Sequence, residues 1–409
     1  MTRGCIPTKA LVRAAEIAHD ARSAHEFGIR LGSVDVDFAA VMERVRTVID
    51  DGISFYERMI ERDVGTTLYR CHARVVGEHA IECGGLTVEF DHLLIATGAR
   101  PRIPDLPGLD SVPFVTSNEL LQATELPGHL VCLGAGAVSL EFAQAYRRFG
   151  AEVTIVLRGP RIARGEDAEL AELLQRYLEE EGIRIVPHAQ IERVELDGGR
   201  PSLVLAGDHR LAGDVLLVAT GREPVAGDLG LDELGIGTGP KGVAVDDRLR
   251  TAVPHVFAIG DAIDGMMFTH VSTYEAPIAI ANMLDGASLT PDYRTMPRTT
   301  FTSPELAGVG LSEEEARAAG YEVEVRRYDV GKLGKARALG ERRGRIKFVL
   351  DARTGVILGA HVLSLHGGDL LPGPMVAMNA PGGTLEPLLA TTHAHPTLSE
   401  AVKVAARDG

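Results

Sequence analysis

Tryptophan is absent from this 409-residue chain, and aromatic residues make up only 5% of it. Binders of single-stranded nucleic acid stack bases on aromatic side chains, so that class of function is disfavoured. The net charge of −15 argues the same way, because a phosphate backbone would be repelled. No apolar run approaches the roughly eighteen residues of a membrane span, and the N-terminus lacks the apolar core of a signal peptide. We therefore expect a cytoplasmic protein with neither a nucleic-acid nor a membrane partner.

Cysteine is also scarce, with Cys5, Cys71, Cys83 and Cys132 as the only four. Four cysteines in a chain of this length do not make a disulfide scaffold. The spacing of Cys71 and Cys83 fits no zinc pattern, and no histidine pair completes one, so no metal site is expected. We expect three of the four to be inert, buried small side chains. Cys5 differs because of the residues around it.

The length predicts two or three domains, since one compact core rarely extends over this many residues. Apolar residues at helical spacing predict two helices between about Leu11 and Asp63. Alternating segments predict strands between Thr67 and Gly98, beginning with a strand over 67–76. Prolines over 101–113 indicate a connector, and a long amphipathic helix is predicted over 167–181.

The segment HLVCLGAGAVSLEFAQAYRRFGAEVTIVL, residues 129–157, combines strand, glycine turn, helix and strand. In such a turn Gly134 permits the sharp bend, Gly136 lets the backbone approach a pyrophosphate, and Ser139 stands where a small residue must pack. The helix N-terminus then offers free N–H groups to the phosphates. The pattern predicts a dinucleotide site, although a plain strand-to-helix turn is the simpler alternative.

The residues after the second strand bear on the choice of nucleotide. An acidic residue there would bind the ribose 2′-OH of NAD, whereas arginine favours the 2′-phosphate of NADP. Leu157 occupies this position, and Arg158 and then Arg161 follow. The sequence therefore favours NADPH over NADH, unless these arginines merely form a solvated face.

Six blocks spread along the chain resemble the class I pyridine nucleotide-disulfide oxidoreductase family, which includes dihydrolipoamide dehydrogenase and mercuric reductase. The blocks are RGCIPTK (3–9), HLLIATGARPRIP (92–104), GAGAVSLEF (134–142), LLVATGREP (216–224), VFAIGDA (256–262) and THAHPTLSEA (392–401). The resemblance implies an α/β fold with Rossmann-like FAD and NAD(P) domains and a C-terminal α+β dimerisation domain. The implied FAD domain covers 1–116 and 248–290, the NAD(P) domain 117–247, and the dimerisation domain 291–409.

The resemblance also assigns residues around FAD. Cys5 corresponds to the redox cysteine nearer the flavin, where a thiolate is the reacting species. Lys9 corresponds to the lysine beside the flavin, and Glu141 to its ion-pair partner. Asp261 corresponds to the acid that binds the ribityl chain. Other cofactor positions are assigned to Thr269, which departs from the small apolar residue usual there, and to the turn glycines Gly98 and Gly221. Without the flanking motifs, Lys9 and Glu141 would be ordinary surface charges and the glycines ordinary turns.

His395 and Glu400 correspond to the family's acid/base histidine and the carboxylate that orients it. In the family this histidine comes from the other subunit, so the resemblance implies a homodimer. His393 is expected to be structural. The implied substrate is a small-molecule or protein-bound disulfide or dithiol.

Two features of the chain depart from the family pattern. The partner of Cys5 and the first glycine turn of the FAD domain would precede Met1, so we expect a truncated FAD domain and impaired activity. The chain ends without the vicinal cysteines of mercuric reductases. HAHPTLSE is closer to dihydrolipoamide dehydrogenase, whereas FTHVSTYEA and the arginines near 158 lean toward the mercuric reductases. A non-catalytic NAD(P)H-binding protein and a peroxide reductase using Cys5 remain alternatives.

Overall fold

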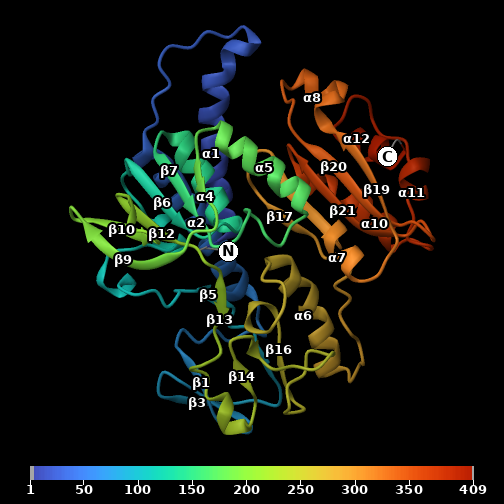
Figure 1. Cartoon of the computed structure of the whole chain (residues 1–409). Helices are drawn as coiled ribbons and strands as arrows, with labels where there is room; N and C mark the ends of the chain where they lie inside the picture. The colour runs from blue at the N-terminus through green and yellow to red at the C-terminus, as the bar shows by residue number, and fades with distance from the viewer. Residues whose placement is uncertain (1–3, 408–409) are drawn as a thin grey trace. The chain divides into compact units, whose positions relative to one another are not determined.

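The computed structural model describes residues 4–407, and contacts divide the chain into two compact units. Unit 1 takes in the chain up to residue 50, residues 104–220, and residues from 294 onward. Unit 2 consists of residues 51–103 and 221–293. Each unit is therefore assembled from segments that are far apart in the sequence (Figure 1).

The predicted nucleotide-binding segment of unit 1 forms a four-stranded parallel sheet. Its strand order is β12 (Val215–Val218), β6 (His129–Leu133), β7 (Glu152–Val156) and β8 (Arg184–Val186). Helix α4 (Ala137–Phe149) follows β6 directly, and α5 (Ala168–Glu180) follows β7. The strands are mostly apolar runs because both faces of the sheet are covered, one by helices and the other by an antiparallel sheet. The predicted order of strand, turn, helix and strand is confirmed.

The N-terminal helices of unit 1 pack on this sheet's helix α4. Helix α1 (Cys5–Ser23) contacts α4 along its length and buries Leu11. Helix α2 (Phe38–Arg62) begins at Phe38, whose ring meets those of Tyr146 and Phe149 edge-on at 5.5 and 5.8 Å. Such aromatic packing adds about 0.5–1.5 kcal/mol beyond the buried area. It holds the start of α2 against α4, the same helix on which α1 packs with Cys5 and Lys9.

A three-stranded antiparallel sheet adjoins the parallel one and covers its other face with apolar side chains. It consists of β9 (Ile191–Asp197), β10 (Arg200–Leu205) and β11 (His209–Ala212). The short helices of this part of unit 1 are η1 (Ala24–Phe27), η2 (Leu109–Ser111) and α3 (Ser117–Leu120).

The C-terminal part of unit 1 is a five-stranded antiparallel sheet with helices around it (Figure 1). The strand order is β17 (Arg298–Thr300), β18 (Glu305–Gly310), β21 (Ile357–Ser364), β20 (Arg345–Asp351) and β19 (Val323–Asp329). The helices are α7 (Glu313–Ala318), η5 (Val330–Lys332), α8 (Gly334–Ala338), α9 (Gly367–Leu370), α10 (Pro372–Asn379), α11 (Glu386–Ala390) and α12 (Glu400–Arg407). The core contains Phe348 and Val362 from the sheet and Ala401 from α12. This architecture matches the α+β domain that the sequence predicts.

A buried lysine connects α5 to this antiparallel sheet within unit 1. Lys347 lies on β20 with only 2% of its side chain exposed. Its Nζ contacts carboxylate oxygens of Asp167 at 2.9 Å, Glu169 at 3.1 Å and Glu313 at 2.9 Å. Asp167 also caps α5 by accepting a hydrogen bond from the Leu170 amide. One ammonium group therefore holds the start of a helix to a strand 180 residues away.

Unit 2 contains four small sheets and a long helix. The three-stranded sheet is β1 (Ala73–Gly77), β2 (Ala80–Cys83) and β3 (Leu86–Glu89). The paired strands are β4 (Leu93–Ile95) with β16 (Val256–Ala258), β5 (Ala99–Pro101) with β13 (Arg222–Pro224), and β14 (Thr238–Gly239) with β15 (Gly242–Val243). The helices are the second half of α2 (residues 51–62), η3 (Leu231–Leu234), η4 (Gly260–Ala262) and α6 (Thr269–Leu284). Only β4–β16 is parallel among these sheets.

Two sequence expectations in unit 2 are wrong. The first strand begins at Ala73 rather than near Thr67. Cys71 and Cys83 form a disulfide, with Cα atoms 5.5 Å apart, instead of being inert separate side chains. The antiparallel register pairs Ala73 with Cys83, which brings Cys71 alongside Cys83 at the end of the sheet. The disulfide therefore ties the segment before β1 to β2.

Candidate active site

The glycine turn between β6 and α4 has the geometry of a dinucleotide site. Gly134 has φ +114°, and a Cβ there would overlap the carbonyl oxygen of Ala219. Ser139 is fully buried and donates a hydrogen bond to the Gly134 carbonyl at 2.7 Å. A Cβ on exposed Gly136 would meet nothing within 4 Å. The turn is therefore closed on the protein side at Gly134 and open at Gly136, where a pyrophosphate can approach helix α4.

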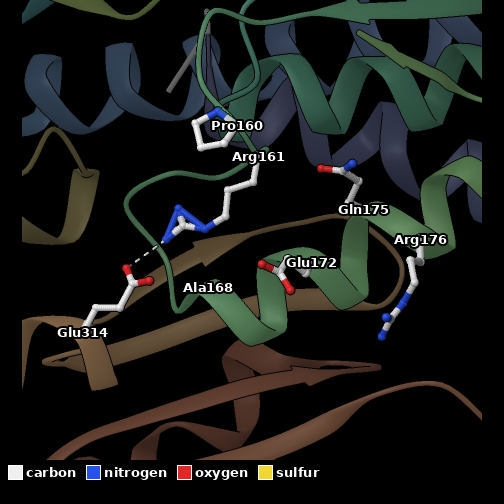
Figure 2. Close-up of a pocket in the computed structure, with 7 residues that line it drawn as sticks. All are labelled: Pro160, Arg161, Ala168, Glu172, Gln175, Arg176 and Glu314. Carbon is white, nitrogen blue, oxygen red and sulfur yellow. Dashed lines mark hydrogen bonds and ion pairs between the residues drawn. The ribbon is translucent and has the colours of Figure 1, made fainter. Parts of the chain in front are cut away.

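The loop after β7 carries three arginines, Arg158, Arg161 and Arg164. Arg158 is exposed. Arg161 is half-buried and contacts Glu314 at 3.4 Å across a cleft of about 500 Å³ (Figure 2). The residues around the cleft are Pro160, Arg161, Ala168, Glu172, Gln175, Arg176 and Glu314. Because Arg161 already has a carboxylate partner, Arg158 is the better candidate for a nucleotide phosphate.

Lys9 and Glu141 lie together in unit 1, one on α1 and the other on α4. Lys9 Nζ donates to both carboxylate oxygens of Glu141, at 3.1 and 2.8 Å. Glu141 is only 4% exposed and also accepts a hydrogen bond from the Phe301 amide at 2.9 Å. The ammonium group lies 4.2 Å from the centre of the Phe301 ring. These contacts fix the ammonium group of Lys9 at a single position.

Cys5 is an exposed thiol at the first residue of α1. Gly4 stands at the N-cap, and Thr8 donates a hydrogen bond to the Gly4 carbonyl at 2.8 Å. Arg3, which belongs to the same sequence block, lies outside the described residues.

The predicted cofactor residues of unit 2 surround two turns and the start of α6. Asp261 follows β16 and lies 3.6 Å from Arg222 Nε. Burial raises the pKa of the Asp261 carboxyl, and Arg222 opposes that shift. Thr269 is the exposed first residue of α6. Gly98 and Gly221 have φ of +74° and +133°, so their turns favour glycine, yet no neighbouring atom would crowd a Cβ at either position.

His395 and Glu400 form a hydrogen-bonded pair near the end of unit 1. His395 Nδ1 lies 2.9 Å from Glu400 Oε1, and the histidine side chain is 80% exposed. Glu400 Oε2 accepts a hydrogen bond from the Thr397 amide at 2.9 Å, and these two contacts lower the pKa of Glu400. An ionised Glu400 keeps the proton on Nδ1, so Nε2 of His395 faces solvent as an acid or base. His393 instead contacts Ser399 at 3.1 Å, and its structural role stays a prediction.

Comparison with family models assigns nearly all of the chain. Residues 1–276 match the model described as "Pyridine nucleotide-disulphide oxidoreductase", and residues 296–406 match the dimerisation domain of the same family. The chain belongs to the pyridine nucleotide-disulphide oxidoreductases. Members of this family are FAD-dependent and take electrons from NAD(P)H. Within residues 4–407, no helix is long and apolar enough to cross a membrane.

Curated relatives carry two different enzyme names. The chain is 36% identical to a mercuric reductase of Streptomyces lividans over 99% of its own length and 87% of the relative's. It is also 36% identical to a dihydrolipoyl dehydrogenase of Chlorobaculum tepidum, covering 99% of this chain and 88% of the relative. A mercuric reductase of Bacillus cereus is 33% identical, and the match spans 98% of this chain but only 64% of that protein.

Solved structures give the same family. The HOCl-induced flavoprotein disulfide reductase RclA from Escherichia coli, solved as a Cu(II) complex, superposes with a TM-score of 0.88 at 28% identity, covering 98% of this chain and 89% of that one. LpdA from Mycobacterium tuberculosis superposes with the same score at 25% identity, covering 99% and 90%. The predicted family and fold are therefore confirmed. The expected truncation and impairment are not supported by these comparisons.

Proposed function

We propose that the protein is an FAD-dependent oxidoreductase that passes electrons between NAD(P)H and a disulfide or dithiol, in the manner of dihydrolipoamide dehydrogenase. The observation that carries the proposal is the pairing of His395 with Glu400 in a chain that also places Cys5 at a helix N-terminus. Disulfide exchange requires a thiol and an acid/base group, and Cys5 and the His395–Glu400 pair are groups of these two kinds. The family's mode of dimerisation further suggests a homodimer in which one protomer's His395 serves its partner's Cys5.

The glycine turn after β6 supports the assignment of NAD(P)H, and the family's motifs carry the assignment of FAD. The open space at Gly136 and the packed Ser139 suit the pyrophosphate of NAD(P)H. We assign Lys9, Glu141, Asp261, Thr269, Gly98 and Gly221 to FAD by the family's motifs. When bound, FAD accepts a hydride from NAD(P)H and supplies an electron pair to a disulfide. Lys9 is held by Glu141 and Phe301, so its charge can stabilise negative charge at a fixed point.

The thiol side of the reaction rests on three residues of this chain. By the family's motif we assign Cys5 to the flavin-facing member of a redox-active cysteine pair. The dithiol form of that pair exchanges with the substrate, so that the enzyme disulfide forms as the substrate disulfide is reduced. His395 accepts and returns the thiol proton at Nε2, while Glu400 holds the imidazole in the required tautomer. Cys71 and Cys83 are joined to each other and Cys132 is buried, so none of these three is assigned to the redox pair with Cys5.

The test separates the two half-reactions by stopped-flow absorbance. Replacing His395 by Ala should leave flavin reduction by NAD(P)H unchanged and slow dithiol exchange about 10²–10⁴-fold, the usual contribution of an acid/base group. His393→Asn, two residues away, is the matched control and should slow neither half. Equal losses in both halves of His395→Ala would assign that residue to the fold. A purified protein without flavin absorbance would instead favour the non-catalytic NAD(P)H-binding alternative.

The choice of nucleotide is a finer proposal. We infer that NADPH binds more tightly than NADH, because Leu157 offers no acceptor to a ribose hydroxyl and exposed Arg158 can meet the 2′-phosphate. Arg158→Ala should cost about 1–3 kcal/mol of NADPH affinity and leave NADH affinity unchanged. Arg176→Ala, an exposed arginine on α5, is the control. An unchanged NADPH affinity in Arg158→Ala would rule the assignment out.

Mercuric ion is the second candidate substrate, because two of the relatives above are named mercuric reductases. One steady-state assay distinguishes the two candidate substrates by following NADPH oxidation with either lipoamide or Hg(II) as the electron acceptor. Turnover with lipoamide alone would support the first proposal. Turnover with Hg(II) alone would replace it.

A further inference from the structure

Two histidines and a glutamate from distant parts of the sequence meet in unit 2. Glu78 and His79 occupy the turn between β1 and β2, and His255 immediately precedes β16. Each of the three offers one ligand atom, and these atoms all lie within 4.8 Å of one another. The two imidazole rings stack with centroids 4.1 Å apart and an angle of 16° between their planes. Glu78 and His79 are exposed, and His255 is half-buried.

Backbone carbonyls fix which nitrogen of each histidine carries a proton. His79 Nδ1 lies 3.0 Å from the carbonyl oxygen of Phe90, and His255 Nε2 lies 2.8 Å from that of Glu78. A carbonyl oxygen only accepts hydrogen bonds, so each of these nitrogens must be the donor. In the neutral ring the opposite nitrogen then carries a lone pair. Metal-binding histidines in proteins show this same arrangement, with the second nitrogen donating to a carbonyl or carboxylate.

We propose that Glu78, His79 and His255 form a surface site for a divalent transition metal of the Zn²⁺ class. Imidazole nitrogens with one carboxylate suit zinc and its neighbours, whereas Mg²⁺ and Ca²⁺ take oxygen ligands. Ligands at about 2.1 Å from a tetrahedral ion lie roughly 3.4 Å apart. The three ligand atoms lie up to 4.8 Å from one another, so they must approach by about 1.4 Å to bind one ion. The ion must lie in the plane of each imidazole, so the His79 ring must also turn out of the stack; its side chain and that of Glu78 are exposed and can move.

The metal would cross-link two segments that the fold has already brought together. His255 is 177 positions from Glu78, and its own carbonyl accepts a hydrogen bond from the Leu93 amide at 3.0 Å. The ligands therefore join the β1–β2 turn to the pair of strands β4 and β16. Three protein ligands leave a fourth position for water or an outside ligand. Sequence spacing hides such a site, because Glu78 and His79 are adjacent and the third ligand lies far along the chain.

The experiment is calorimetric titration of the full chain with Zn²⁺. A Cys5→Ser background prevents the exposed thiol from supplying a ligand. We expect one equivalent of Zn²⁺ to bind, and no heat with Mg²⁺. His79→Asn and Glu78→Gln should each weaken Zn²⁺ binding at least about 10–100-fold, since losing even an outer-shell partner costs that much. His72→Asn is the matched control, because His72 is an exposed histidine of the same unit outside the cluster.

Thermal unfolding is a second measurement, and it distinguishes loss of the metal site from loss of the fold. Zn²⁺ should raise the midpoint of thermal unfolding for the parent and the control, because a ligand that binds only the folded state stabilises it. At the same Zn²⁺ concentration the midpoint of the cluster variants should rise less than that of the parent and the control. Glu78→Gln changes an exposed side chain and leaves the backbone carbonyl that holds His255, so its fold should survive. Equal Zn²⁺ affinity in the cluster variants and the control would overturn the proposal, as would the lack of any binding by the parent.

Discussion

Removing the ammonium group of Lys347 should strongly destabilise unit 1. Its side chain is 2% exposed and lies within 2.9–3.1 Å of three carboxylates. Burial on its own lowers the pKa of Lys347, but the contacts with Asp167, Glu313 and Glu169 outweigh it and raise the pKa. The sign of the shift means that the stabilisation is complete below the ordinary value of 10.5 and is lost only as pH rises above it. Measurements near pH 7.5 therefore report the full effect.

The magnitude follows from what the lysine leaves behind. Breaking a buried ion pair by removing one partner costs about 3–5 kcal/mol, because an uncompensated charge remains buried. Lys347→Met keeps most of the aliphatic stem, so its loss of stability measures the charge rather than a cavity. Adding Asp167→Asn removes one stranded charge and keeps the cap on α5, since asparagine is as good an N-cap as aspartate. The double variant should therefore lose less than the sum of the two single variants, by more than 1 kcal/mol.

The assay is urea unfolding followed by far-UV circular dichroism, because the chain contains no tryptophan for fluorescence. Lys332→Met is the matched control. Lys332 contacts Asp329 at 3.1 Å in the same C-terminal part of unit 1, but its side chain is 66% exposed. An exposed pair contributes at most about 1 kcal/mol. If Lys347→Met cost no more than Lys332→Met, or if the double variant were additive, the buried network would not stabilise unit 1 as described.

Three further outcomes test other parts of the structure. Burial alone would raise the pKa of Glu169, but contacts with arginines and Lys347 outweigh it and lower the pKa from 4.5 to about 2. About 1–2 kcal/mol of stability should therefore be lost as pH falls from 4.5 to 2. The urea midpoint of Glu169→Gln should fall less steeply over this pH range than that of the parent. Replacing Cys71 and Cys83 by serine should lower the free energy of unfolding of unit 2 by about 2–3 kcal/mol, because the disulfide joins residues 12 positions apart. In thermal unfolding, the parent protein with this disulfide reduced should have the same midpoint as the variant. Gly134→Ala should destabilise the fold by about 1–3 kcal/mol because of its positive φ and crowding, whereas Gly136→Ala should fold normally and lose nucleotide affinity in fluorescence titration.

Local patterns in the sequence predict the parts of the fold whose geometry is set by nearby residues. The turn at Gly134 and Ser139 is one example, because strand, glycine and helix follow one another directly. The helix predicted over 167–181 is another, since its apolar spacing and its Asp167 cap are local signals. The dimerisation domain was predicted only through the family resemblance. No local period in residues 291–409 defines that sheet.

Features that depend on strand register or on distant segments could not be predicted. The disulfide forms because the β1–β2 register places Cys71 beside Cys83, and a spacing of 12 gives no sign of that pairing. A lysine in a strand is ordinarily solvated, so the burial of Lys347 depends on acidic residues from two other elements. The pairing of Lys9 with Glu141 could be predicted only through the family, because 132 positions separate them.

The division of each unit among separate chain segments has a consequence for synthesis on the ribosome. Helix α1 packs on α4, more than a hundred residues later, and unit 1 gains its last sheet only from residue 294 onward. Unit 2 likewise needs residues 221–293 to complete the strands begun by β4 and β5. Neither unit can complete its fold early in translation, so the apolar faces of α1 and α2 stay exposed on the nascent chain. Such discontinuous topology slows folding and lengthens the window for self-association. Chaperone dependence should therefore be greater for this chain than for one in which the same two units followed each other in sequence.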